Sequence, residues 1–174
     1  MVSVNVTNGS ISLGGSDGAV DLTPKNLIAG NPFTLTLTDL DLIGVVPLPS
    51  VVVERADPSD PATIIETVTI DLSLATESPA GTFTYSLATV FDDGSILDSS
   101  DLILGIQAGD LIDVVYQDDL DAQGNQVDAR LDPSDPITIL AGIDGVVSLT
   151  PLSLPVGGSF SLNVTDTDIP AGGG

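Results

Sequence analysis

The sequence predicts an all-β protein built as an antiparallel β-sandwich, and three observations favour this class. Apolar and polar residues alternate along many short segments rich in Val, Ile and Thr, as is typical of half-buried strands. Turn-forming pairs such as Asn8-Gly9 and Asp17-Gly18 separate these segments. No window carries a 3.6-residue apolar stripe with helix caps, so we do not expect a substantial helix.

The expected strands follow from this alternation, taken in order along the chain. The stretch Ser99–Gly109 comes nearest to a helical pattern, and we interpret it as a strand or a short turn. Many short strands at regular spacing indicate a sandwich or a barrel, and an immunoglobulin-like sandwich is the commonest solution. The segments with the strand pattern are Val2–Val6, Ser10–Leu13, Ala19–Leu22, Phe33–Thr38, Ser50–Arg55, Ala62–Leu74, Thr82–Thr89, Leu111–Gln117, Val127–Leu131, Pro136–Leu140, Val146–Thr150 and Ser159–Thr165.

A repeat with an offset of 127 residues organises the chain. Fifteen of the thirty-two residues between Ile11 and Leu42 are identical to their counterparts between Thr138 and Ile169. A fixed internal period marks a recurring structural unit. We therefore expect an N-terminal strand segment at 1–14, one complete immunoglobulin-like sandwich at 15–142, and a partial second repeat or donor-strand segment at 143–174. This last segment either opens a further unit of a tandem array or completes a neighbouring copy of the chain.

The charge balance excludes several classes of partner. Three basic residues, Lys25, Arg55 and Arg130, face twenty-five acidic ones, for a formal net charge of −22. Nucleic acids and anionic membrane surfaces are therefore not expected, because both are bound through many Lys and Arg side chains. No apolar run reaches the roughly 18 residues of a membrane-spanning helix, so no membrane span is expected. Bound divalent cations would relieve the self-repulsion of so many carboxylates.

Acidic residues gather after strand ends, where they are candidate calcium ligands. Asp39 and Asp41 follow the expected strand Phe33–Thr38, and continued alternation would place their oxygens on one side of that strand, as a hard cation requires. The alternative is that these acids only solubilise loops, since no EF-hand loop is present. The other candidate calcium ligands are Asp92, Asp93, Asp110, Asp118, Asp119, Asp121, and the repeated pair Asp166 and Asp168.

Catalysis is not expected from this composition. Histidine and cysteine are absent, which removes the usual general base, the thiol nucleophile and the ordinary zinc ligands. Paired carboxylates could serve a glycosidase, but the chain has no Trp and few other aromatic residues with which to stack a sugar. We therefore predict that the protein is not an enzyme.

A second repeat, Arg-x-Asp-Pro-Ser-Asp-Pro, occurs at Arg55–Pro61 and Arg130–Pro136. Proline disfavours helix and lacks an N–H donor, so both copies are expected to turn the chain between strands. One interpretation is that each arginine neutralises the aspartate pair of its own loop. The other is that the two loops form a repeated contact surface between units.

A family resemblance rests on four motifs in a fixed order. LTLTDLDL, VVVERADPSDPATIIETVTIDL, ESPAGTFTYSLAT and LGIQAGDLIDVVYQDDLDAQGN resemble the repeat of large bacterial and archaeal surface proteins, over roughly Val20 to Asp121. The resemblance implies an extracellular immunoglobulin-like or cadherin-like sandwich. It also implies calcium held by Asp39 and Asp41 together with Asp118, Asp119 and Asp121. The sequence departs from the pattern at Leu42-Ile43 and in the DPSDP insertions.

Two structural functions are compatible with this resemblance. Related surface proteins assemble into filaments in which a strand of one subunit completes the sheet of the next. We expect a structural subunit of an extracellular, calcium-stabilised filament, joined head to tail to copies of itself, with Ser159–Thr165 or Val2–Val6 as the donated strand. The alternative is a spacer or ligand-binding domain of a tandem-repeat adhesin, with a cell-surface or host ligand.

Overall fold

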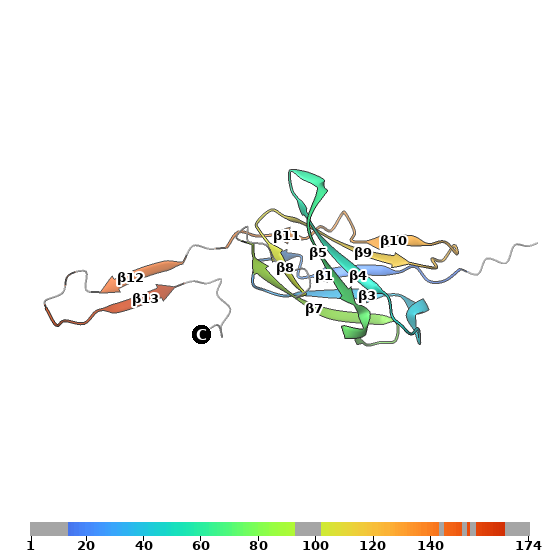
Figure 1. Cartoon of the computed structure of the whole chain (residues 1–174), viewed down its shortest axis with the longest axis horizontal. Coiled ribbons are helices and arrows are strands. Elements are labelled where there is room, and N and C mark those ends of the chain that lie inside the picture. The colour runs from blue at the N-terminus through green and yellow to red at the C-terminus, as the bar shows by residue number, and fades with distance from the viewer. Residues whose placement is uncertain (1–13, 93–101, 143–144, 151–152, 154–155, 166–174) are drawn as a thin grey trace, which may run out of the picture.

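The structure, a computed structural model, describes residues 14–92, 102–142, 145–150, 153 and 156–165, and it shows an all-β sandwich (Figure 1). The predicted fold class is confirmed. Two sheets face each other across one hydrophobic core. A separate two-stranded hairpin follows the sandwich and extends away from it.

The first sheet has the strand order β1-β3-β7-β6, with every neighbouring pair antiparallel. A fifth strand, β8, runs parallel to the second half of β7. The two-residue β6 lies beside the first half of β7, so β7 has a different neighbour along each half of this edge. The strands are β1 (Ala19–Thr23), β3 (Phe33–Thr38), β6 (Thr76–Glu77), β7 (Thr82–Phe91) and β8 (Ile103–Ile106).

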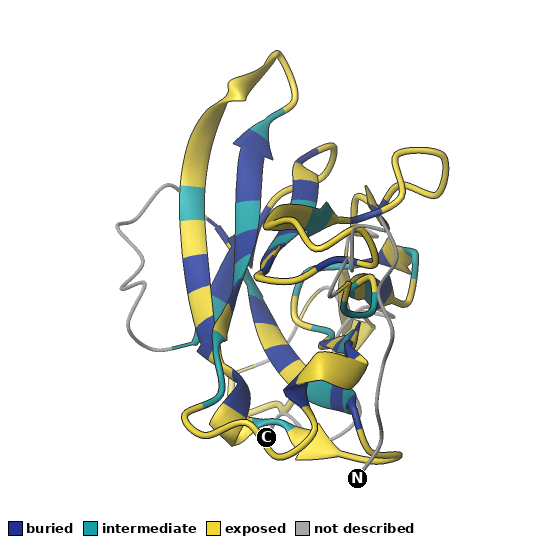
Figure 2. Ribbon diagram, turned by 90° about the vertical axis from the view of Figure 1, so that its right-hand side faces the viewer, coloured by how far each residue is buried: buried dark blue, intermediate teal, exposed yellow. Residues whose placement is uncertain are grey.

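The second sheet is fully antiparallel, in the order β10-β9-β4-β5. The register of β4 against β5 shifts around Ala56, and beyond that irregularity the two strands continue as a projecting ribbon whose β5 residues 60–65 are exposed (Figure 2). The strands are β4 (Ser50–Asp57), β5 (Asp60–Asp71), β9 (Leu111–Asp118) and β10 (Val127–Arg130). Short 3₁₀ turns, η1 (Leu40–Leu42) and η2 (Leu72–Leu74), follow β3 and β5.

The core follows from the alternation in the sequence, because successive side chains of a strand point to opposite faces of the sheet. Phe33, Leu35 and Leu37 of β3 are buried, whereas Thr34 and Thr38 are exposed. The same pattern gives the alternating bands of burial in Figure 2. Facing β3 from the second sheet are buried residues of β4, β5 and β9, namely Val51, Val53, Val68, Ile70, Val114 and Tyr116.

The chain enters the sandwich at one end and leaves at the other. We call the end formed by residues 14–18, Asp39 and Asp118 the entry end, and the end formed by Phe91, Asp110 and Ile139 the exit end. A short parallel pair, β2 (Asn26–Leu27) with β11 (Thr138–Ile139), closes the sandwich next to the exit end. The Leu140 amide then donates to the Leu27 carbonyl at 2.8 Å, and the chain continues toward the hairpin.

The hairpin consists of β12 (Val146–Thr150) and β13 (Ser161–Thr165), paired antiparallel. All ten of these residues are exposed. The hairpin therefore presents apolar side chains to solvent on a strand pair that has no core of its own.

The predicted strands agree with the structure apart from short or interrupted elements. The two-residue strands β2 and β6 were not expected, and they lack the length that makes alternation visible. The expected strand Ala62–Leu74 ends at Asp71, because Asp71 caps η2 by accepting the Ser73 amide. Val2–Val6 and Ser10–Leu13 lie outside the described residues.

Candidate functional site

Asp39 and Asp41 do not continue the alternation of β3, contrary to expectation. Asp39 caps η1: its Oδ1 accepts the Asp41 amide at 2.8 Å, so the chain turns at the point where a strand was expected to run on. Asp39 is only 2% exposed, and its Oδ2 accepts a 2.6 Å hydrogen bond from the Tyr116 hydroxyl of the opposite sheet. Asp41 is exposed. The pair therefore closes a turn and joins two sheets.

The segment preceding β1 is fitted closely against this turn. The Ser16 amide donates to Asp41 Oδ2 at 2.7 Å, and the Ser16 hydroxyl donates to Asp39 Oδ1 at 3.2 Å. The Gly15 amide donates to the Asp121 carbonyl at 2.8 Å. A Cβ on Gly15 would overlap both Asp41 Oδ2 and the Leu120 carbonyl oxygen, so only glycine fits there.

The acids after β9 are likewise held by N–H donors. Asp118 is 1% exposed and accepts from the Gly18 amide at 2.7 Å and from the Leu120 amide at 2.9 Å. Asp121 accepts from the amides of Asn125 and Gln123 at 2.7 and 2.9 Å, and these bonds hold the pKa of its carboxyl below the usual value. Asp119 accepts from the side-chain amide of Gln126 at 2.6 Å.

Asp39, Asp41, Asp118, Asp119 and Asp121 are thus brought to the same end of the sandwich, as the resemblance implies. Within the described ranges, however, no three acidic side chains approach closely enough to form a metal-binding group. Their oxygens accept protein N–H and O–H donors instead of converging on one point. This arrangement does not fit a preformed calcium site, so calcium binding stays a prediction from charge and resemblance.

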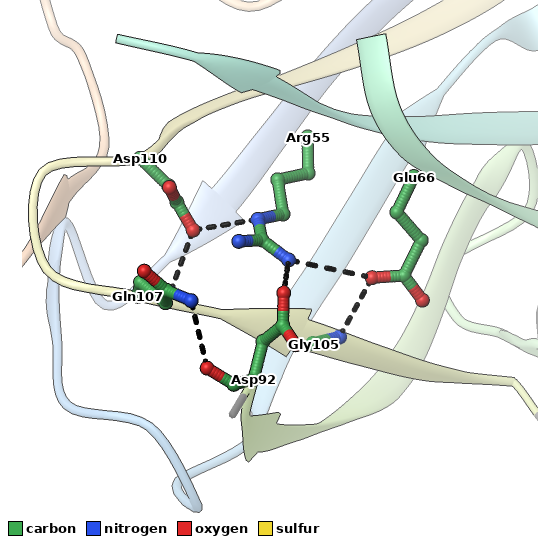
Figure 3. A network of polar contacts seen from close by, with 6 residues as sticks. All are labelled: Arg55, Glu66, Asp92, Gly105, Gln107 and Asp110. Atoms are coloured by element: carbon green, nitrogen blue, oxygen red, sulfur yellow. Dashed lines mark hydrogen bonds and ion pairs between the residues drawn. The ribbon is translucent and has the colours of Figure 1, made fainter. Parts of the chain in front are cut away.

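Asp92 and Asp110 lie at the exit end, far from the other candidate ligands, and they surround a buried arginine (Figure 3). Arg55 is 3% exposed; its Nη1 lies 2.5 Å from Asp92 Oδ2 and 4.0 Å from Glu66 Oε2. Its Nε forms an ion pair with Asp110 Oδ2 at 2.6 Å, outside hydrogen-bond alignment. One cation therefore serves three carboxylates, and Asp92 and Asp110 do not join the acids around Asp39 and Asp41, contrary to expectation.

The interpretation that each arginine neutralises the aspartates of its own loop is wrong. Arg55 bonds the exit-end acids, and Arg130 bonds Asp113 at 2.7 Å and approaches Glu54 at 3.6 Å. The first aspartate of each loop is bonded by serine instead: Asp57 accepts from the amide and hydroxyl of Ser59, and Asp132 does the same with Ser134. The two DPSDP loops therefore repeat one local turn, and both lie between strands, as predicted. The second aspartates differ, since Asp60 accepts from Thr63 and Asp135 pairs with Lys25.

An apolar pocket of about 440 Å³ opens at the exit end, where the chain leaves the sandwich. Phe91, the last residue of β7, is 67% exposed at this pocket. The remaining lining is apolar and comes from β8, from the segment after β2 and from the departing chain, namely Ile28, Ala29, Ile106, Ala108, Ile139, Leu140, Ala141 and Gly142.

The hairpin reproduces the β1–β3 pair of the sandwich. In the sandwich Ala19 pairs with Thr38 and Leu22 with Leu35; in the hairpin the residues 127 positions later pair in the same way, Val146 with Thr165 and Leu149 with Leu162. Their environments differ sharply. Leu22 and Leu35 are 0% and 1% exposed, whereas Leu149 and Leu162 are 46% and 57% exposed. The hairpin thus has the register of a core strand pair and lacks the core.

The sequence did not identify Tyr116, Ser16 or the exit-end pairing of Arg55 as parts of these sites. The repeat could have drawn attention to residues 14–18, since Gly15, Asp17 and Gly18 are all kept at the 127-residue offset. Asp17 accepts the Ala122 amide at 2.9 Å, so this identity reflects a contact. Asp93, Asp166 and Asp168 lie outside the described residues.

No protein-family model and no curated protein matches this chain. In the portion of the chain that the structure describes, no helix is both long and apolar enough to cross a membrane.

Proposed function

We propose that this protein is a structural unit of an extended array of β-sandwiches on a cell surface. In this array the hairpin β12–β13 supplies the strands equivalent to β1 and β3 of the adjoining unit. The observation that carries the proposal is the shared register of β12–β13 and β1–β3, combined with the exposure of the hairpin's apolar face. An array of this kind acts as a spacer, and this corresponds to the alternative function given in the sequence analysis, the spacer domain of a tandem-repeat adhesin. The extracellular location is part of the proposal and rests on the resemblance.

The residues kept in the repeat support this role for the hairpin. Gly15 and Gly18 pack where a Cβ would meet Leu120 and Tyr116, and both remain glycine in the repeat, as Gly142 and Gly145. The inward residues Leu22, Phe33 and Leu35 also recur unchanged. The second opening segment therefore keeps these glycines and inward residues, whereas Gly14 and Ser16 are replaced by Ala141 and Ile143. We call the second set of strands against which it would fit, equivalent to β4–β11, the acceptor.

The pairing of the described strands favours burial of the hairpin in an adjoining unit over exchange of hairpins between copies. In each copy, the residues that the structure describes contain two hairpins, β1–β3 and β12–β13, and one acceptor. If copies exchanged hairpins, one exposed hairpin would remain for every acceptor, so exchange would bury no additional apolar surface. An isolated two-stranded hairpin is at best marginally stable in water. A second acceptor joined after residue 174 would bury it.

A two-unit chain tests this proposal directly. Residues 48–142 would be joined after Gly174, which continues the repeat in register because Gly174 corresponds to Pro47. Amide hydrogen exchange of residues 146–165 would then be compared in the two-unit and the 174-residue chains. We expect the hairpin amides to become as protected as those of β1 and β3. Exchange of the hairpin at the same rate in both chains would refute the proposal.

Filament formation by exchange is the second candidate, and the matching register of the two hairpins is also what favours it. The chain has no cysteine, so an engineered disulfide can be placed cleanly. Thr34 and Ser86 pair across β3 and β7 on the exposed face, and Thr34→Cys with Ser86→Cys would lock the resident hairpin in place. Fibres that form only after reduction would support exchange. A Val52→Cys and Val115→Cys pair between β4 and β9 is the control, since it leaves β1–β3 free.

Calcium binding is proposed separately, because the charge of −22 still calls for counterions. Asp41→Asn with Asp119→Asn is the better test than any change at Asp39, because Asp39 is buried and holds Tyr116. Calorimetric titration with calcium, against magnesium at equal ionic strength, separates a specific site from general screening. If calcium and magnesium gave equal heats of binding, and the substitutions did not change them, the cations would act only by general screening and the calcium site would be refuted.

A further inference from the structure

We infer that the apolar pocket around Phe91 is an interface between units, and that its occupant is the entry end of the adjoining unit, with the turn equivalent to residues 39–46 facing the pocket. The inference rests on the proposed function, because it requires the hairpin to belong to a folded neighbour. It adds that successive units are in contact and not merely linked.

The length of the connection is the first argument. The sandwich holds the chain as far as Leu140, whose amide donates to the Leu27 carbonyl. In the repeat, Gly142 corresponds to Gly15, whose amide is already bonded within the body of its own unit. Only Ala141 lies between these two fixed positions. At about 3.8 Å per residue, the Cα atoms of Leu140 and Gly142, which are held by the first and the second unit, lie less than roughly 8 Å apart. The two sandwiches must therefore meet at the exit end of the first.

The direction of the hairpin is the second argument. Val146 pairs with Thr165, so β13 returns the chain to the start of β12, four residues from Gly142 in the pocket wall. The residues next in sequence, 166–173, correspond to residues 39–46, the turn that closes the entry end of the first unit. In a folded neighbour, the equivalent turn would therefore begin close to the pocket.

The chemistry of the two ends is the third argument. At the entry end the turn presents Leu40, Ile43 and Val46 to solvent, with exposures of 57%, 52% and 91%. At the exit end the pocket presents Phe91 and Leu140, exposed by 67% and 42%. In the repeat, the three turn positions are Thr167, Pro170 and Gly173, so the facing turn offers a proline ring and a glycine to the Phe91 ring in place of large aliphatic side chains. In a protein with a charge of −22, the exposed Phe91 and Leu140 give the exit end an apolar surface suited to such a contact.

A tryptophan reporter tests the inference. The chain contains no Trp, so Phe91→Trp in the first unit introduces a single tryptophan, which can be excited selectively, at an exposed position. We expect its emission to move to shorter wavelength, and its quenching by acrylamide to fall several-fold, when the 174-residue chain is extended to the two-unit chain defined above. Val46→Trp in the first unit, at the opposite end, should stay exposed in both chains.

Four outcomes of the Phe91→Trp experiment are separable. Protection of the introduced indole only in the two-unit chain supports the inference. Protected hairpin amides with the indole equally quenched in both chains would overturn it and leave the proposed function standing. Concentration-dependent protection of the indole in the 174-residue chain would also overturn it, because the occupant would be a second copy. An unprotected hairpin in the two-unit chain would defeat the proposed function and this inference together.

Phe91→Ser provides a second readout that does not depend on fluorescence. Because Phe91 is largely exposed, the change should leave the unfolding of each unit as it was. We expect small-angle scattering of the two-unit chain with Phe91→Ser to show a broader distribution of distances between the units than the two-unit chain without the substitution. An unchanged distribution would mean that the pocket does not fix their orientation, which would overturn the inference.

Discussion

The Tyr116 hydroxyl donates a 2.6 Å hydrogen bond to Asp39 Oδ2, and through it β9 of one sheet holds the turn that follows β3 of the other. Both residues are 2% exposed. Because Asp39 is almost wholly buried, its carboxyl group is stabilised by the donors supplied by Tyr116, Ser16 and the Asp41 amide.

Tyr116→Phe is therefore expected to lower the free energy of unfolding by about 2 kcal/mol, because it removes a hydrogen bond to a buried charged group. Urea denaturation monitored by circular dichroism measures this. Tyr85→Phe is the matched control: Tyr85 is half-buried on β7, and its change should cost clearly less. Equal losses at the two tyrosines would contradict the special role of the Tyr116–Asp39 pair.

Alkaline pH should destabilise the protein through the same pair. Burial, and then the hydrogen bond to Asp39, raises the pKa of Tyr116. The folded protein therefore keeps a proton that the unfolded chain loses above its ordinary tyrosine pKa of about 10. Stability is fully present below that pH and falls above it, by up to about 1.4 kcal/mol per pH unit.

The pH dependence of unfolding should be measured from pH 8 to about pH 11, for the wild-type chain and for Tyr116→Phe. Lys25, whose pKa is raised by its hydrogen bond to Asp21, contributes in the same direction and does so in both proteins. The difference between the two slopes isolates Tyr116. Parallel slopes would show that Tyr116 ionises equally in the folded and unfolded states.

Arg55→Ala should be among the most damaging single changes, at about 3–5 kcal/mol, because it leaves Asp92, Asp110 and Glu66 with no cation between them. Arg130→Ala is the matched control. Arg130 is half exposed and pairs with Asp113 at the surface, so the cost should stay below about 1 kcal/mol.

Removing the charges of the aspartates around Arg55 tests why Arg55→Ala lowers the free energy of unfolding. In Arg55→Met with Asp92→Asn and Asp110→Asn, the uncompensated charge is largely removed, and we expect part of the lost stability to return. Thermal unfolding of the single and triple variants gives the comparison. A triple variant less stable than Arg55→Ala would point to lost packing instead of lost charge compensation.

Gly15→Ala should destabilise the sandwich by about 1–3 kcal/mol, since the new methyl group would overlap Asp41 and the Leu120 carbonyl. Gly142→Ala, at the equivalent position of the repeat, is exposed in the 174-residue chain and should be nearly neutral there. In the two-unit chain the same Gly142→Ala change should become costly, as Gly15→Ala already is. Guanidinium denaturation of these three variants and of the two unsubstituted chains checks both statements.

The fold could be predicted from the sequence where one face of a strand is buried and the other is not. Phe33–Thr38 shows why: its alternation is enforced by a core on one side, so pattern and structure coincide. The two-residue strands could not be predicted, because Asn26–Leu27 is a strand only by virtue of Thr138–Ile139, more than a hundred residues away. Long-range pairing of this kind leaves no local pattern.

The site could be predicted in location but not in chemistry. The acids after β3 and β9 do meet at one end, as the resemblance implied, whereas Asp92 and Asp110 lie at the other end. The sequence could not reveal that Asp39 turns the chain by capping η1, nor that Arg55 reaches Asp92 and Asp110 and not the aspartates of its own loop. Both depend on which donors the folded chain brings within reach, and aspartates can bind either N–H groups or cations.

The parallel pairing of β2 with β11 determines how the unit responds to tension. In an array of the kind proposed, a force along the array would pull residue 14 and residue 140 in opposite directions, because the chain enters the sandwich at one end and leaves at the other. The hydrogen bonds from Thr138 to the Lys25 carbonyl and from Leu140 to the Leu27 carbonyl, both 2.8 Å long, lie across that direction. They are therefore strained in shear and must rupture together, whereas the turn-linked hairpin β12–β13, left without an acceptor, could be pulled apart one bond at a time.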